Sequence, residues 1–201
     1  WDIKNAKNLK GMFRNCPNLH FWENGLSPSM VNGPALTSKT NCDISNWNTS
    51  NVTDMKFMFM DNNHIGKQSL AVRQYTPAWR WDTSKVTDMT AMFQRWQGKW
   101  LHDIGSWDVS NVKYFGWMFE ACLWQTNAEQ GFDEDIVPSN WEHVKLDRWD
   151  VSNGMQFVEM FQGLNNQQNT MNNNATIGVG PWRTENAVNM TAMFHNAWNR
   201  D

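Results

Sequence analysis

The chain has 201 residues and a formal net charge of −3 at pH 7, with 14 Trp, 13 Met and 11 Phe. This weakly acidic balance gives no basic field for nucleic acid or an anionic membrane, so neither is expected as a partner. No run of residues approaches the roughly 18 apolar positions of a spanning helix, so we expect no membrane insertion within this segment. Aromatic and thioether side chains must build most of the core.

One pattern recurs along the whole chain. A tryptophan is followed by an apolar residue at five and at eight positions further on, with Gly154 as the one exception, and by Met-Phe at eleven and twelve. The six copies begin at Trp1, Trp47, Trp81, Trp107, Trp149 and Trp182. Repeats of this size cannot bury an apolar face alone and form a core only by stacking. The repeat therefore predicts a single solenoid domain over 1–201 with about six turns, whose tryptophans and Met-Phe pairs form the core.

In chain order, each unit is expected to contain a short strand, a tight turn and a short helix. Apolar residues three positions before the tryptophan, as in 42–46 and 101–106, alternate as in a strand of four or five residues. After the tryptophan, the apolar spacing of three, three and one suits one or two helical turns, with Thr-Asp as a cap just before Met55 and Met89. The fold class predicted from these elements is an α/β repeat solenoid that is leucine-rich-repeat-like.

Unequal spacing between the tryptophans predicts loop insertions between the turns. Successive tryptophans are 46, 34, 26, 42 and 33 residues apart, and the shortest step leaves room for one bare turn. We expect insertions near 24–41, 62–78, 124–145 and 164–176. Parts of these segments are polar or rich in Gly, Pro and Asn, as loops are. The chain begins and ends inside a repeat without polar caps, so we expect a fragment of a longer array.

The repeat phrases resemble those of a known family. Residues 47–59, 81–93 and 107–112 are similar to the repeat of the BspA-type leucine-rich-repeat surface proteins, which are also catalogued as a domain of unknown function in mycoplasmas, lactobacilli and many protists. The resemblance covers all six copies. It implies a right-handed leucine-rich-repeat-like solenoid that is exposed on cells and linked to adhesion or host contact. It supplies no catalytic residues.

Eight further tryptophans do not follow the repeat offsets used above. They are Trp22, Trp79, Trp96, Trp100, Trp117, Trp124, Trp141 and Trp198. Trp96, Trp100, Trp117 and Trp124 fall in consecutive units, so stacking could place them on adjacent turns as a platform for a sugar or a protein partner. The alternative for Trp117 is that it covers a neighbouring turn.

The sequons are consistent with a secreted chain, and the cysteines leave two interpretations open. Asn-X-Ser/Thr triplets stand at Asn48, Asn51, Asn174 and Asn189, and Asn174 in a polar loop is the favoured glycosylation site. Three cysteines show no metal-binding spacing. Either Cys16 and Cys42 form a disulfide that closes the first insertion, or the cysteines are buried free thiols.

No motif indicates catalysis, a metal or a cofactor. The acidic run 133–135 lacks calcium-loop spacing, and the five histidines occur singly without a metalloprotease or nucleophile motif. We therefore expect a non-enzymatic extracellular or cell-surface protein that binds a protein or glycan on another surface, or copies of itself. The alternatives are a self-assembling structural protein and, less favoured, a carbohydrate-active enzyme.

Overall fold

The computed structural model describes the repeat units and parts of the segments between them. The described residues are 1–16, 20–21, 41–42, 44, 47–62, 81–96, 102–122, 143–164, 176–180 and 182–197. We call the six repeat units coils 1 to 6 and number positions from each tryptophan, so that Trp47 is position 0 of coil 2. The coils are 1–16, 47–62, 81–96, 107–122, 149–164 and 182–197. The predicted insertions lie almost wholly outside the described residues.

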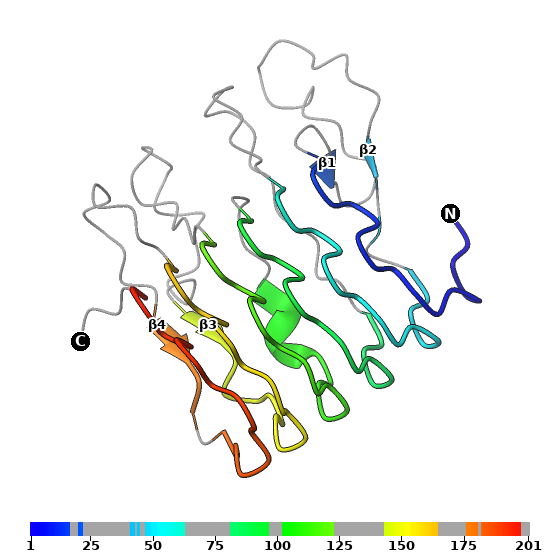
Figure 1. Ribbon diagram of the computed structural model, residues 1–201. Helices are drawn as coiled ribbons and strands as arrows, with labels where there is room; N and C mark the ends of the chain where they lie inside the picture. The colour runs from blue at the N-terminus through cyan, green and yellow to red at the C-terminus, as the bar shows by residue number, and fades with distance from the viewer. Residues whose placement is uncertain are drawn as a thin grey trace, which may run out of the picture.

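The coils lie side by side and in register (Figure 1). Parallel bridges join position 7 of each coil to position 7 of the next, through Asn8, Asp54, Asp88, Tyr114, Gln156 and Asn189. Backbone N–H groups at positions 8, 10, 12 and 14 donate to carbonyls of the following coil, as in Met55 to Asp88 at 3.0 Å and Phe59 to Met92 at 2.9 Å. The register is thus kept across steps of very different length, because the insertions leave the coil between the same two positions.

Consecutive turns occupy the segment where we expected a short helix. Within coil 2, Met58 N–H donates to Met55 C=O at 3.2 Å and Met60 N–H to Phe57 C=O at 3.2 Å, which are turn hydrogen bonds. Phe57 and Asp61 have φ values of 59° and 58°, outside the right-handed helical region. The helices expected near Met55 and Met89 are therefore absent from the described coils. Assignment to the leucine-rich-repeat-like α/β class stays a prediction.

Short strands pair outside the coils. Strand β1 (His20–Phe21) pairs in parallel with β2 (Asn41–Cys42), and β3 (His143–Lys145) pairs in parallel with β4 (Thr176–Gly178). The strand expected over 101–106 is instead a 3₁₀ helix, η2 (His102–Ser106).

A turn before the tryptophan accounts for this difference. Trp107 N–H donates to Ile104 C=O at 3.1 Å, and Trp149 N–H donates to Leu146 C=O at 3.0 Å. The turn buries the apolar residue three positions before the tryptophan.

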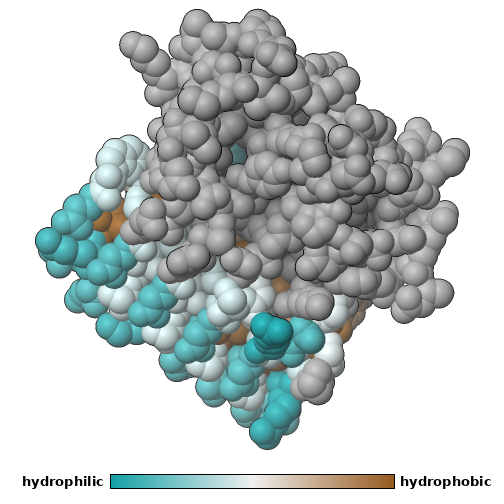
Figure 2. Space-filling view, turned by 180° about the vertical axis from the view of Figure 1, so that it is seen from behind, coloured by the Kyte–Doolittle hydropathy of each residue, from teal (hydrophilic) through white to brown (hydrophobic). Residues whose placement is uncertain are grey.

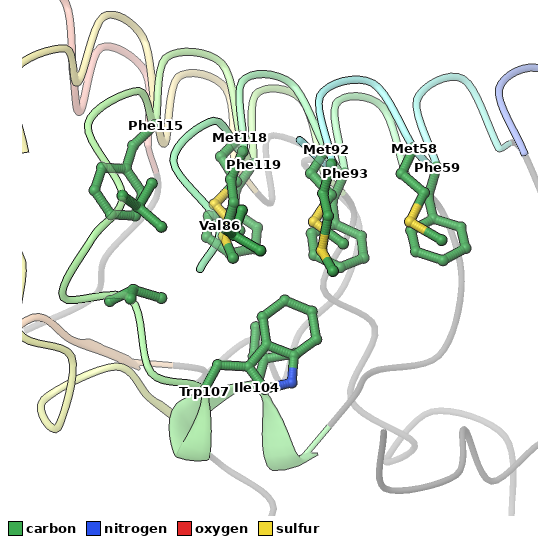
Figure 3. Close-up of a cluster of buried hydrophobic side chains, with 14 of the residues drawn as sticks. Met58, Phe59, Val86, Met92, Phe93, Ile104, Trp107, Phe115, Met118 and Phe119 are labelled. Atoms are coloured by element: carbon green, nitrogen blue, oxygen red, sulfur yellow. The ribbon is translucent and has the colours of Figure 1, made fainter. Parts of the chain in front are cut away.

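The core is a set of aromatic and methionine ladders that run along the stack. In Figure 3 the Met-Phe pairs of coils 2, 3 and 4 lie side by side in a row and point into the same interior. The phenylalanines at position 12 stack on one another, with ring centroids 5.5 Å apart for Phe13 and Phe59 and 5.6 Å for Phe59 and Phe93. The tryptophans stack likewise, at 6.2 Å for Trp47 and Trp81. The expectation that these residues form the core is confirmed for coils 2 to 5.

The indole N–H groups of three repeat tryptophans make one recurring contact, whereas that of Trp96 is buried without a hydrogen-bond partner among the described residues. Trp81 Nε1 donates to Ile44 C=O at 2.8 Å, Trp149 to Ile104 C=O at 2.7 Å, and Trp182 to Leu146 C=O at 2.8 Å. Each acceptor belongs to the turn before the preceding tryptophan. Because a buried donor without a partner is costly, this bond explains why position 0 is tryptophan and not phenylalanine.

Candidate functional site

Of the four tryptophans of the predicted platform, the structure describes Trp96 and Trp117 and places only Trp117 in contact with solvent. Trp96 is only 3% exposed and meets the rings of Phe59 and Phe93 edge-on, at 5.7 and 6.0 Å between centroids. Trp96 is therefore a core residue, and its place in a ligand platform was a wrong prediction. Trp100 and Trp124 lie outside the described residues.

Position 15 explains the burial of Trp96. This position closes the run of turns and points inward, so that Asn62, Cys122 and Leu164 are buried at the same place in their coils. The sequence alone shows that Cys16 and Cys122 are equivalent, because each stands fifteen residues after a repeat tryptophan. Extending the same count to residue 96 would have placed its indole in the core.

Trp117 lies on the outer face of coil 4. It occupies position 10 with φ 56° and is 37% exposed, and its Nε1 donates to Glu159 Oε2 at 3.1 Å. Glu159 holds position 10 of the next coil, so the indole reaches towards its neighbour. Trp117 therefore covers part of a neighbouring coil, as one interpretation of the sequence predicted. It also presents a large apolar surface to solvent, as the platform interpretation requires.

Tyr114 is a second exposed aromatic residue, 42% exposed at position 7 of the same coil. Sequence reasoning missed it. A signal was available, because position 7 is Asn or Asp in four of the other coils and Gln in the fifth. Gly116 lies between the two aromatic residues in sequence and adds no side chain. We call Tyr114 and Trp117 the aromatic platform.

Glu159 lies at the indole N–H of Trp117, and polar side chains at position 13 pair between neighbouring coils. The Gln94 side-chain amide donates to Glu120 Oε2 at position 13 of coils 3 and 4, and Gln162 Nε2 contacts His195 Nδ1 at 3.2 Å in coils 5 and 6. Aromatic faces with carboxylates and amides beside them can stack on an apolar ring face and accept hydrogen bonds from hydroxyl groups. Figure 2 shows rows of hydrophilic side chains on the described surface, with hydrophobic residues between them.

A different group surrounds Phe57 at position 10 of coil 2. Lys56 Nζ lies 5.0 Å from the centroid of its ring, Arg14 Cζ 5.5 Å and Lys10 Nζ 5.9 Å. Such distances allow cation–π attraction. We call Lys10, Arg14 and Lys56 the cationic cluster.

Carboxylates at position 1 have structural partners. Ser84 donates to Asp82 Oδ1 through its hydroxyl at 2.6 Å and its backbone N–H at 3.0 Å, which lowers the pKa of that carboxyl. Hydrogen bonds from Ser152 lower the pKa of Asp150 in the same way. These aspartates close the turn after the tryptophan and are not poised for acid–base chemistry.

The sequon asparagines also serve the repeat. Asn48 Oδ1 accepts from the Ser50 hydroxyl at 2.7 Å, in the place that Asp82 takes in coil 3. Asn51 Nδ2, the atom to which a glycan would be attached, donates to Lys4 C=O at 2.9 Å. Asn189 Oδ1 accepts from Thr191 N–H at 2.9 Å. Glycosylation stays a prediction, and its favoured site, Asn174, lies outside the described residues.

Free thiols are found where the structure describes cysteine side chains. Cys16 is half-buried with its Sγ 3.6 Å from Arg14 C=O, so the predicted Cys16–Cys42 disulfide is not formed in this structure. Cys122 Sγ donates to Phe93 C=O at 2.7 Å, and burial raises the pKa of its thiol. Both residues occupy the inward position 15.

Among the described residues, no group of three or more His, Cys, Asp or Glu is placed to hold a metal ion. The acidic run 133–135 lies outside them. A search of the same part of the chain finds no helix whose length and apolar character would let it cross a membrane.

One family model matches the chain, under the description "Mycoplasma protein of unknown function, DUF285". The matches cover residues 1–74, 30–145 and 139–201 and so reach from one end of the chain to the other. No curated protein and no solved structure matches the chain.

Proposed function

The chain belongs to the DUF285 family of unknown function, and from that premise we propose that it is a non-enzymatic, BspA-type leucine-rich-repeat surface protein. In this proposal it acts outside the cell or on its surface and mediates adhesion by binding a protein or glycan. Family membership and the repeat phrases support the surface assignment. Contacts spread over several coils would provide the affinity.

The aromatic platform is the observation that carries this proposal. Large apolar side chains are normally buried, yet Trp117 and Tyr114 are 37% and 42% exposed at positions where the other coils, apart from Phe57 in coil 2, carry small or polar residues. Exposed aromatic residues dominate the binding energy of many interfaces because they bury a large area with few rotatable bonds. The platform is therefore the centre of the proposed binding face.

A glycan and host-protein array tests the proposal. We expect the wild-type chain to bind a defined subset of the array, and a Tyr114→Ala/Trp117→Ala variant to bind it at least tenfold more weakly, a loss of about 1.4 kcal/mol. Val188→Ala is the matched control, because it truncates an apolar side chain that is exposed on coil 6. Equal binding by all three proteins would remove the platform from the proposal, and no binding by the wild type would remove adhesion.

Self-assembly is the second candidate. Trp1 and Phe194, in the first and last described coils, are 81% and 49% exposed, whereas their ladder equivalents in coils 2 to 5 are buried. A further coil packed against either residue would cover it, and a second copy could supply that coil. Electron microscopy of the purified chain distinguishes the candidates: filaments or sheets support assembly, and dispersed particles support a binding protein.

A further inference from the structure

The cationic cluster concentrates positive charge on a chain that is acidic overall. Lys10 and Arg14 come from positions 9 and 13 of coil 1, and Lys56 from position 9 of coil 2. All three approach the half-buried ring of Phe57 within 5.9 Å of its centroid. The stacking register brings them together, since Lys10 and Lys56 are 46 residues apart in sequence.

Acidic groups only partly balance this charge. Lys56 Nζ lies 3.9 Å from Asp88 Oδ2, while Lys10 and Arg14 form no ion pair within the residues that the structure describes. Asp54 of coil 2 accepts hydrogen bonds from Lys56 N–H and Asn8 Nδ2, and Asp61 of the same coil pairs with Arg95. Like charges held close together repel, so an anion bound among the three cations would be stabilised.

The cationic cluster and the aromatic platform share one stripe of the outer face. Phe57 and Trp117 both occupy position 10, two coils apart, with the small and buried Ala91 between them. Neighbouring parallel segments lie about 4.8 Å apart, which places the two features on the order of 10 Å from each other. One extended ligand can therefore contact both.

We propose that this stripe binds an anionic polysaccharide, with a sulfate or carboxylate group among Lys10, Arg14 and Lys56 and a neighbouring sugar ring on the aromatic platform. The proposal rests on the proposed function and specifies the ligand class of the same outer face. A polysaccharide suits the stripe because its charges are spaced. Neutral hydroxyl groups can then lie beside the carboxylates of Glu159 and Glu120. A nucleic acid would instead bring a negatively charged phosphate near these carboxylates with every nucleotide.

Titration calorimetry with a sulfated glycosaminoglycan hexasaccharide tests the proposal. The comparison ligands are the same hexasaccharide after desulfation, a hexauronate that carries carboxylates in place of sulfates, and a single-stranded oligonucleotide. The test variant is Lys10→Gln/Arg14→Gln/Lys56→Gln. The matched control is Lys4→Gln/Lys85→Gln/Lys113→Gln, which removes the same charge from exposed positions of coils 1, 3 and 4. Near-ultraviolet circular dichroism of the tryptophans verifies that each variant is folded.

We expect the wild type and the control variant to bind a charged hexasaccharide with affinities within threefold of each other, and the cluster variant to bind it at least tenfold more weakly. Added salt should weaken the wild-type binding more than that of the cluster variant. Equal binding by the cluster variant, or preference for the oligonucleotide, would overturn the proposal. Binding to array proteins or neutral glycans without any binding to the charged hexasaccharides would overturn it and leave the proposed function standing.

Discussion

At the scale of single residues, the indole hydrogen bond decides which aromatic side chain a coil accepts. Trp81 stacks between Trp47 and Trp107, at centroid distances of 6.2 and 5.9 Å, and also donates to Ile44 C=O. Phenylalanine could replace the stacking but not the donor. The buried carbonyl would then lose its indole partner, at a cost of about 1–3 kcal/mol.

Trp81→Phe should therefore lower the free energy of unfolding by about 1–3 kcal/mol, measured by chemical denaturation. Trp1→Phe is the control, because Trp1 is largely exposed and should change stability by less than about 0.5 kcal/mol. Equal effects of the two substitutions would show that the indole donor does not stabilise the coils.

The position-1 carboxylates make a second residue-scale prediction, which concerns pH. Hydrogen bonds from serine hold the pKa values of Asp82 and Asp150 below the ordinary value of 3.8. A lowered folded pKa contributes stability that is fully present above the ordinary pKa and is lost as pH falls through the folded one. We expect Tm to change little between about pH 5 and 7 and to fall below about pH 4, with a smaller fall in Asp82→Asn/Asp150→Asn. An acid dependence unchanged in that variant would exclude these two groups as its source.

At the scale of the element, the run of turns depends on residues with positive φ at positions 10 and 14. Gly163 has φ 63° at position 14, and the nearest atom to an added Cβ would be Ala121 Cα at 3.9 Å. Space is available there, so only the backbone conformation opposes a side chain. Gly116, at position 9 with no positive φ, has ordinary contact distances as well.

Gly163→Ala should therefore destabilise the chain by about 1 kcal/mol, while Gly116→Ala should be neutral or stabilising. Thermal unfolding of the two variants measures the difference. If this segment were a helix, Gly163→Ala would instead stabilise the chain, since alanine stabilises a helix interior by about 1 kcal/mol relative to glycine. Stabilisation by Gly163→Ala would thus contradict the turn assignment.

The sequence predicted the register of each element better than its conformation. Apolar residues at positions 5, 8, 11 and 12 had to face one core, and they do so in coils 2 to 5, where Gly154 stands at position 5 of coil 5. The same spacing fits a helix and a series of β-turns, because both close every three or four residues. The positive φ values of Phe57, Ala91 and Trp117 could not be predicted from the sequence. A glycine would have indicated them, and Gly11 is the only glycine among the position-10 residues.

The candidate site was predictable in part for a related reason. Trp117 was a candidate from its sequence and is exposed, whereas Trp96 was a candidate and is buried. The inward direction of position 15 becomes evident only when Asn62, Trp96, Cys122 and Leu164 are compared as equivalent positions. Phe57 and its three cations could not be found, because their approach depends on the register between coils 1 and 2.

At the scale of the whole molecule, the ladders make the stability of each coil depend on its neighbours. Phe93 is fully buried, with Phe59 and Phe119 stacked on its two faces at 5.6 and 5.8 Å between centroids. Among the described residues, the ring stacked on Phe194 is that of Phe161, and Phe194 is half exposed. A residue covered on both faces loses more contacts when it is truncated.

We therefore expect Phe93→Ala to cost about 3–5 kcal/mol in the free energy of unfolding and Phe194→Ala distinctly less. Guanidinium denaturation monitored by tryptophan fluorescence measures both. Similar losses at the two positions would argue against a ladder whose members support one another along the stack.

The central claim is that equivalent residues of successive coils contact each other through one continuous core. The position-11 methionines Met58, Met92, Met118, Met160 and Met193 mark that core, and three of them are seen side by side in Figure 3. Nuclear Overhauser spectroscopy of the chain labelled at its methionine methyl groups tests the claim directly. We predict cross-peaks between methyl groups of neighbouring coils, in the order 58, 92, 118, 160 and 193, and none between coils further apart. Methyl groups without contacts between neighbouring coils, or with contacts out of this order, would contradict the account.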